Sequence, residues 1–166
     1  MIVLGIDPGT EITGYGVVRG ENVHDPVLVE CGVIRTLAKD ALPARLHAIH
    51  DGMTDLITRH KPDVVCVENV FFARNARTTL TLGHARGVIL LAAAQHGVAI
   101  RELAPRAIKK AVVGSGAGTK EQVQFMVARL LHLKSAPKPA DAADGVAAAL
   151  AYLIGAHTER LLAAGR

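Results

Sequence analysis

Four carboxylates stand where elements of the chain are expected to begin or end. Asp7 and Glu68 each close a short apolar run, and a turn follows each of them. Asp141 and Asp144 are three residues apart at the start of an Ala-rich stretch, a spacing that puts both on one face of a helix. Taken singly, each has an ordinary explanation as a turn former or as a capping residue near a helix N-terminus.

The combination of these carboxylates points to metal chemistry. Buried carboxylates repel one another and destabilise the fold unless a cation neutralises them. Hard oxygen donors without a Cys or His pattern select Mg²⁺ or Mn²⁺ over zinc. If the two strands are neighbours and the last helix crosses their ends, the four carboxylates converge and could hold two divalent ions roughly 4 Å apart, the arrangement that hydrolyses phosphodiesters.

The elements that must position these residues follow from the hydrophobic periodicity. Three strands with short connections predict an antiparallel meander, and two further strands are each preceded by a helix. The expected fold class is α/β, a five-stranded mixed sheet of three antiparallel strands plus two added by crossovers, flanked by helices. The predicted strands are Ile2–Asp7, Thr13–Arg19, Val27–Thr36, Val64–Val67 and Val98–Leu103, and the predicted helices are Leu42–Ile57, Asn75–His96, Pro105–Val113, Thr119–His132 and Ala140–His157.

Composition limits the remaining possibilities. The 166 residues suffice for one domain, and an apolar content of 50% excludes a disordered protein. The net charge of +4 is too weak to identify a polyanion partner. Two cysteines in apolar runs, a start without a secretion signal and apolar runs too short to cross a bilayer predict a cytoplasmic protein without a membrane partner. We expect a single domain over residues 1–157 and a short mobile tail over 158–166.

Several motifs, in order along the chain, resemble the RuvC-type Holliday junction resolvases. They are Met1–Thr10, Thr13–Gly16, Val67–Ala76, Leu82–Gly87, Val112–Gly116, Lys120–Val123 and Ala140–Ala147. The resemblance implies an RNase H-like fold, a homodimer, and cleavage of two opposed strands of a four-way DNA junction in recombination and repair. It also implies two Mg²⁺ or Mn²⁺ ions per subunit and a branch-migration motor of the RuvA–RuvB type as partner.

Carried over by position, the resemblance assigns the metal ligands and catalytic residues to Asp7, Glu68, Asp141 and Asp144. Some relatives place a histidine at the position of Asp141. Since no Ser, Tyr or His is placed to form a covalent intermediate, hydrolysis should leave 5′-phosphate and 3′-hydroxyl ends.

The DNA contacts are expected after the strand that ends in Glu68. Phe71 and Phe72 are two of the three phenylalanines in the chain, and Arg74, Asn75 and Arg77 follow them. Neighbours on an extended segment face opposite ways, so both rings cannot easily enter the core. An aromatic on a basic loop suits stacking on an unpaired base, and the family's wedge phenylalanine aligns with Phe71, while Phe72 is either core or shares the task.

Two further groups complete the expected sites. Lys109 and Lys120 match lysines that the family uses near the scissile strand, although a solvated surface is the ordinary place for a lysine. Gly83, His84, Gly87 and Leu91 lie on a helix through which the family dimerises, and small residues at this spacing allow close approach. The same spacing would also suit packing of the helix on its own sheet.

Three other functions remain open at this point. Asp7-Pro8-Gly9-Thr10 resembles the phosphate loop of actin-like ATPases and sugar kinases, but those enzymes need a second lobe and leave Asp141 and Asp144 unexplained. A non-catalytic junction-binding module would use the acids only structurally. An RNase H-like nuclease of the small YqgF type would share the first motif but lack the Phe71 loop and the Lys120 segment.

Overall fold

A five-stranded mixed sheet forms the middle layer of the protein. The computed structural model describes residues 1–20, 25–69 and 76–165. The strands are β1 (Ile2–Asp7), β2 (Ile12–Arg19), β3 (Val27–Arg35), β4 (Val64–Glu68) and β5 (Ala99–Leu103), in the order β3-β2-β1-β4-β5. β1, β2 and β3 pair antiparallel, whereas β4 and β5 add in parallel. The expected mixed sheet is therefore confirmed.

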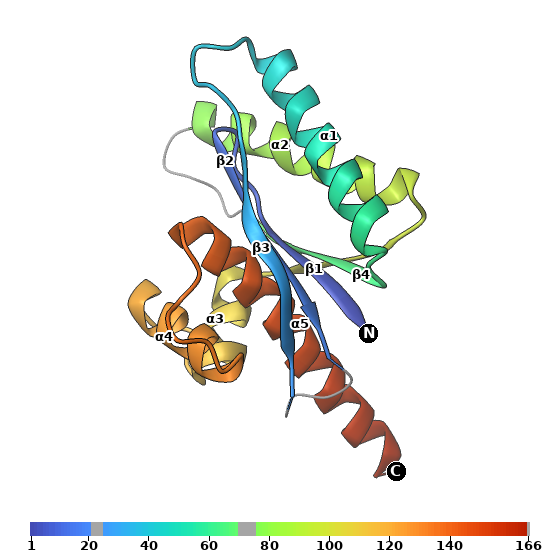
Figure 1. Ribbon diagram of the computed structural model, residues 1–166, viewed down its shortest axis with the longest axis vertical. Coiled ribbons are helices and arrows are strands. Elements are labelled where there is room, and N and C mark those ends of the chain that lie inside the picture. Colours follow the sequence, from blue (N-terminus) through green and yellow to red (C-terminus); the bar gives the residue numbers. More distant parts are fainter. Residues whose placement is uncertain (21–24, 70–75, 166) are drawn as a thin grey trace.

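Helices cover both faces of this sheet (Figure 1). One face carries α1 (Leu42–His60) and α2 (Ala76–Gln95), whose buried side chains pack with Leu4, Ile6 and Val67. The other face carries α3 (Pro105–Val113), α4 (Lys120–Leu130) and α5 (Ala140–Ala164), which pack with Val3 and Cys66. Each face has its own apolar core, and the sheet separates the two.

The two-residue period of the strands decides which face each carboxylate joins. Successive side chains of a strand point to opposite faces. Since Leu4 and Ile6 face α1 and α2 while Val3 faces α5, Asp7 belongs to the α5 face. The same alternation in β4 puts Glu68 on the face of Cys66, which is also the α5 face.

α5 lies unusually close to β1 and β2 because glycines line the contact. A Cβ built on Gly5 would collide with the carbonyl oxygen of Gly145, and one on Gly14 would collide with the carbonyl oxygen of Asp141. From the helix side, a Cβ on Gly145 would lie 2.6 Å from Cα of Tyr15. The backbone of α5 therefore packs directly on the backbone of β1 and β2. This contact fixes the position of the first turns of α5 along the sheet.

The C-terminal end of α5 differs from the sequence prediction. The sequence predicts a helix end near His157, but the helix continues to Ala164, so the predicted helix end is wrong. Beyond Leu153 the helix leaves the sheet, and Leu161 and Leu162 are exposed. Local helix propensity of an Ala- and Leu-containing segment is enough to continue a helix that packing has already started. Within the described ranges, no helix combines the length and apolarity that a membrane span requires.

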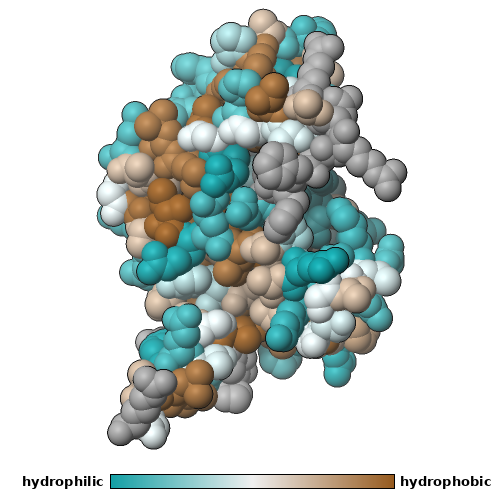
Figure 2. Space-filling model, turned by 180° about the vertical axis from the view of Figure 1, so that it is seen from behind, coloured by the Kyte–Doolittle hydropathy of each residue, from teal (hydrophilic) through white to brown (hydrophobic). Residues whose placement is uncertain are grey.

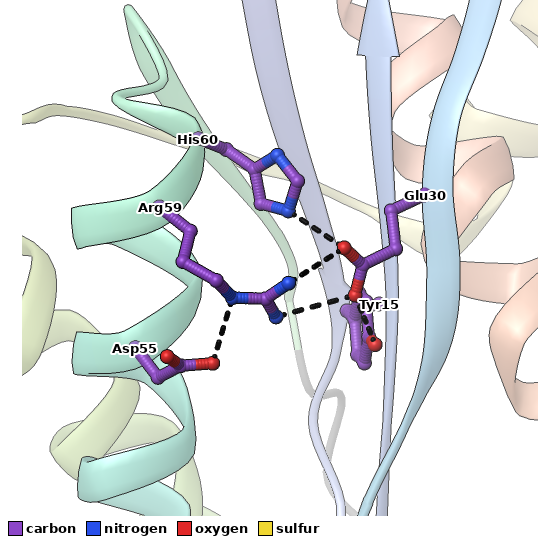
Figure 3. A network of polar contacts seen from close by, with 5 residues as sticks. All are labelled: Tyr15, Glu30, Asp55, Arg59 and His60. Atoms are coloured by element: carbon purple, nitrogen blue, oxygen red, sulfur yellow. Dashed lines mark hydrogen bonds and ion pairs between the residues drawn. The ribbon is translucent and has the colours of Figure 1, made fainter.

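An ion-pair network fastens the edge strand β3 to α1 (Figure 3). Glu30 accepts hydrogen bonds from Tyr15 Oη at 2.8 Å, from Arg59 Nη1 at 2.9 Å and from His60 Nε2 at 2.9 Å. Asp55 holds the same guanidinium through Nε. Burial opposes ionisation of Glu30, but the hydrogen bonds from Arg59, Tyr15 and His60 outweigh it and lower the pKa of this carboxyl.

The glycine contact can be tested with two glycines of the same helix. Gly145→Ala should lower the free energy of unfolding by about 2 kcal/mol, because its methyl group meets the backbone of Tyr15. Gly155→Ala has no described atom within 4 Å of its Cβ position and should instead stabilise by about 0.5–1 kcal/mol through helix propensity. Thermal unfolding followed by circular dichroism measures both. Equal effects of the two substitutions would contradict the close packing of α5.

Candidate active site

Asp7 and Glu68 lie side by side at the carboxyl ends of parallel strands. β1 and β4 are in register with Ile6 opposite Val67, so the next residue on each strand is a carboxylate. Both side chains share the α5 face, as the alternation requires. Each is only partly exposed. The two strands are thus neighbours, which is the condition under which their carboxylates converge.

α5 brings Asp144 to the same place. Asp7, Glu68 and Asp144 line one cleft of about 110 Å³. The remaining wall consists of two lysines and four apolar or proline side chains from α3, α4 and α5. These other residues are Lys109, Lys120, Pro105, Ile108, Val123 and Ala147, of which the last four are the apolar ones.

Asp141 takes a different position from Asp144. Its backbone carbonyl is the group that faces Gly14, and its side chain does not line the cleft. Its charge still reaches the cleft, since it contributes to raising the pKa of Asp7. Three carboxylates therefore form the cleft, and the fourth lies beside it.

The buried position of Asp7 makes its ionisation unfavourable. Burial raises the pKa of Asp7 from 3.8 to about 7, with Glu68, Asp144 and Asp141 adding to the increase and Lys120 opposing it. Burial and Asp144 also raise the pKa of Glu68, against the lowering effect of Lys120 and Lys109. The physical cause is the same for both carboxyls, because negative charge collects where little water reaches it.

Lys120 supplies positive charge to this cleft. Its Nζ lies 3.1 Å from Oδ2 of Asp144, and this hydrogen bond raises the pKa of the lysine. The lysine is the first residue of α4, whose N-terminus is fixed by a capping box. Gln122 N donates to Thr119 Oγ1 at 3.3 Å, and Thr119 N donates to Gln122 Oε1 at 2.8 Å. Thr119 and Gln122 therefore form a complete capping box.

The donors of the cleft suit a hard divalent cation. The carboxylates offer oxygen ligands only, and their raised pKa values show a local excess of negative charge that a cation would relieve. Over the described ranges, no three His, Cys, Asp or Glu side chains are grouped tightly enough to enclose an ion as they stand. Mutual repulsion and the Lys120–Asp144 ion pair are consistent with this looser spacing.

The predicted DNA-binding loop cannot be compared with the structure. Phe71, Phe72, Arg74 and Asn75 lie outside the described residues, as does the side chain of Arg77, which belongs to the first turn of α2. Lys109 and Lys120 do line the carboxylate cleft. The sequence analysis missed the apolar wall made by Ile108 and Val123, although both lie on the buried stripes of α3 and α4.

The residues expected at a dimer interface form a second surface feature on α2. Gly83, His84, Gly87 and Leu91 line a shallow groove of about 450 Å³ together with Leu46, Thr79, Leu80 and Val88. Leu80 is 67% exposed and Leu91 is 52% exposed. No described atom lies within 4 Å of a Cβ built on Gly83 or Gly87. Packing of α2 on its own sheet therefore does not account for these glycines.

Sequence comparisons connect the chain to one family. A family profile described as "Crossover junction endodeoxyribonuclease RuvC" matches residues 3–152. A protein of that name from Desulforamulus reducens is 46% identical over 153 residues, which cover 92% of this chain and 93% of the relative. Another from Vibrio vulnificus is 47% identical over 163 residues, covering 98% of this chain and 91% of the relative.

Solved structures agree with this assignment. The chain is similar to Thermus thermophilus RuvC in complex with a Holliday junction substrate, with a TM-score of 0.91, 34% identity and 96% of each chain covered. The yeast mitochondrial Holliday junction resolvase has a TM-score of 0.67 at 14% identity, over 95% of this chain and 82% of its own, and supports the fold alone. The expected RNase H-like fold is confirmed.

The pKa of Asp7 predicts a pH-dependent gain in stability for Asp7→Asn. A folded pKa of about 7, above the ordinary 3.8, means that the contribution of Asp7 to stability is present in acid and is lost as pH rises through 7. In metal-free protein, Asp7→Asn should match the native chain near pH 4 and unfold about 4–8 °C higher at pH 8. Differential scanning calorimetry with chelator at both pH values measures this difference.

Asp40→Asn is the matched control, because Asp40 is an exposed carboxylate that does not line the cleft. It should leave the melting temperature unchanged at both pH values. A melting difference between Asp7→Asn and the native chain that is the same at pH 4 and pH 8 would contradict the burial of an ionised Asp7.

Proposed function

Because the chain belongs to the RuvC family of crossover junction endodeoxyribonucleases, we propose that it resolves four-way (Holliday) DNA junctions by hydrolysing two opposed strands. The observation that carries the proposal is the cleft where Asp7, Glu68 and Asp144 meet two lysines. A relative 34% identical to this chain has been solved with a Holliday junction substrate. The family profile spans nearly the whole chain, which favours a resolvase over the ATPase, the binding module and the YqgF-type nuclease.

Two Mg²⁺ or Mn²⁺ ions per subunit are part of the proposal. Asp7, Glu68 and Asp144 would hold them, with Asp141 as a fourth ligand from the edge of the cleft. When bound, such ions polarise a phosphate oxygen and lower the pKa of an attacking water. The chain's own part is to hold the carboxylates in place, while the apolar wall limits water around the scissile phosphate.

The two lysines supply positive charge for the DNA strand. Lys120 is paired with Asp144 in the structure and would exchange that partner when a cation neutralises the carboxylate. Its ammonium is then available to a phosphate of the scissile strand, together with Lys109. No Ser, Tyr or His is among the described residues that line the cleft, so none of these three nucleophiles is available there to form a covalent intermediate. We therefore expect water to attack directly, leaving 5′-phosphate and 3′-hydroxyl ends.

The loop after β4 is proposed to recognise the junction itself. Phe71 would stack on an unpaired base at the branch point, with Phe72 either sharing that task or packing in the core. Arg74, Asn75 and Arg77 would contact the phosphate backbone beside it. These roles rest on the family resemblance of the loop sequence.

We infer a two-fold symmetric dimer with α2 at its interface. Four-way junctions contain two equivalent scissile strands, and one cleft reaches only one of them. The groove around Gly83 and Gly87 has exposed apolar rims in Leu80 and Leu91, and Figure 2 shows hydrophobic side chains gathered over the half of the molecule built from α1 and α2. A symmetric contact would bring the same patch of both subunits together.

The cellular setting is proposed from the family alone. It comprises homologous recombination and DNA repair in the cytoplasm, with a branch-migration motor of the RuvA–RuvB type as partner. A motor of this kind would move the branch point until a preferred sequence reaches the cleft.

Cleavage of a synthetic junction tests the proposed activity. The native chain should cut a mobile four-way junction with Mg²⁺ or Mn²⁺ and leave linear duplex intact. Asp7→Asn should abolish cleavage yet bind the junction with native affinity, because removing one negative charge does not weaken phosphate contacts. Gel electrophoresis of end-labelled strands measures cleavage, and a mobility shift measures binding. Asp40→Asn is the control, and near-native cleavage by Asp7→Asn would disprove the metal-site assignment.

Replacing Gly87 tests the dimer. Gly87→Leu should force the two α2 helices apart and give mostly monomer in sedimentation velocity, while Gly155→Leu, on exposed α5, should remain a dimer. The monomer should bind Mn²⁺ normally but lose paired incision and leave nicked junctions at most. A native-like dimer of Gly87→Leu would place the interface on another surface.

A further inference from the structure

The turn that follows Asp7 is held by an arginine from the opposite side of the sheet. Arg45, in the first turns of α1, donates from Nε to the carbonyl oxygen of Thr10 at 3.2 Å and to Oγ1 of Thr36 at 3.2 Å. Thr10 belongs to the connection between β1 and β2, three residues after Asp7. Arg45 thus ties α1 and the end of β3 to the segment that leaves the carboxylate cleft.

Other hydrogen bonds complete this clamp. Thr36 Oγ1 donates to the Thr10 carbonyl oxygen at 2.5 Å, and Thr36 N donates to the carbonyl oxygen of Glu11 at 3.0 Å. Thr13 Oγ1 donates to the carbonyl oxygen of Gly9 at 2.6 Å. Three consecutive carbonyls of the turn, from Gly9 to Glu11, are therefore fixed by groups outside the turn or at its far end.

The burial of Arg45 is not explained by its contribution to stability. Its side chain is only 11% exposed, and its Nη2 is buried without a hydrogen bond, 3.9 Å from the carboxylate of Glu11. A buried guanidinium with an unsatisfied nitrogen is destabilising compared with an apolar side chain of similar length. The turn it holds is the direct continuation of the strand end that presents Asp7.

We propose that Arg45 is a positioning residue for the cleft: with Thr36, it fixes the turn after β1 and so holds the Asp7 carboxylate where a divalent cation is bound. The strand ladder alone secures Asp7 only through its pairing with Gly14, the last pair between β1 and β2. A loose turn would let that last pair open and the carboxylate shift. The inference rests on the proposed function, because it assigns Asp7 to the metal.

The test separates the clamp from general stability. Arg45→Met keeps the apolar length but removes the donors, and Thr36→Val removes the hydroxyl without changing shape, whereas Thr36→Ser keeps it. Arg59→Met is the matched control on the same helix, since it breaks the Glu30 network far from the cleft. Mn²⁺ binding without DNA, kcat, KM for the junction and the melting temperature are measured for each variant.

We expect Arg45→Met to weaken Mn²⁺ binding about 10-fold and to lower kcat about 10-fold, the usual range for a residue that orients a metal ligand, with KM unchanged. Thr36→Val should show a smaller change in the same direction, and Thr36→Ser should behave as the native chain. Arg59→Met should lower the melting temperature but leave Mn²⁺ affinity and kcat unchanged.

Native Mn²⁺ affinity in Arg45→Met, or a loss no larger than in Arg59→Met, would overturn the positioning role while leaving the nuclease proposal intact. Failure of the nuclease proposal would be seen in a different measurement, because the native chain would then not cut junctions. The Mn²⁺ isotherms, which need no DNA, would still report on Arg45.

Discussion

The close approach of α5 to β1 and β2 is the constraint on which the rest of the structure depends. Glycines on both partners allow backbone to pack on backbone, and a single methyl group at Gly5, Gly14 or Gly145 would collide with the main chain of the other element. Closeness of this kind leaves no freedom for the helix to slide or roll. It therefore fixes Asp144 opposite the ends of β1 and β4, where Asp7 and Glu68 already lie.

This arrangement concentrates negative charge that Lys120 and Lys109 only partly balance. Burial and mutual repulsion raise the pKa of Asp7 and of Glu68. Among the described residues that line the cleft, one ion pair forms, between Lys120 and Asp144. A cluster of buried carboxylates destabilises the fold by itself. A cation that binds only the folded state would restore that stability. Lys120 can neutralise charge with or without a bound cation, because it can pair with Asp144 before a cation binds and with a phosphate afterwards.

The sheet divides the proposed tasks between its two faces. The α5 face carries the carboxylates and lysines, while α2 on the other face presents the glycine-lined groove proposed for the second subunit. Arg45 connects the two, because it comes from α1 and holds the turn that follows Asp7.

Features that depend on residues adjacent in the chain were predictable from the amino-acid pattern. Strand periodicity placed Asp7 and Glu68 at strand ends, and the order of elements gave the mixed sheet, since alternation of side chains is a local property of the backbone. The capping box of Thr119 and Gln122 was predictable for the same reason. Family resemblance added the roles of the carboxylates, which the residues alone left open between capping and metal binding.

Contacts between residues far apart in the chain became visible in the tertiary structure alone. Lys120 and Asp144 are 24 positions apart, and their pairing follows from how α4 packs against α5. The different places of Asp141 and Asp144 follow from the depth at which α5 meets Gly14, and the contact of Arg45 with Thr10 spans 35 positions. Such contacts depend on the angle and the distance at which two elements pack. Both are set by the shapes of the two packed surfaces together, so a local pattern of side chains cannot predict them.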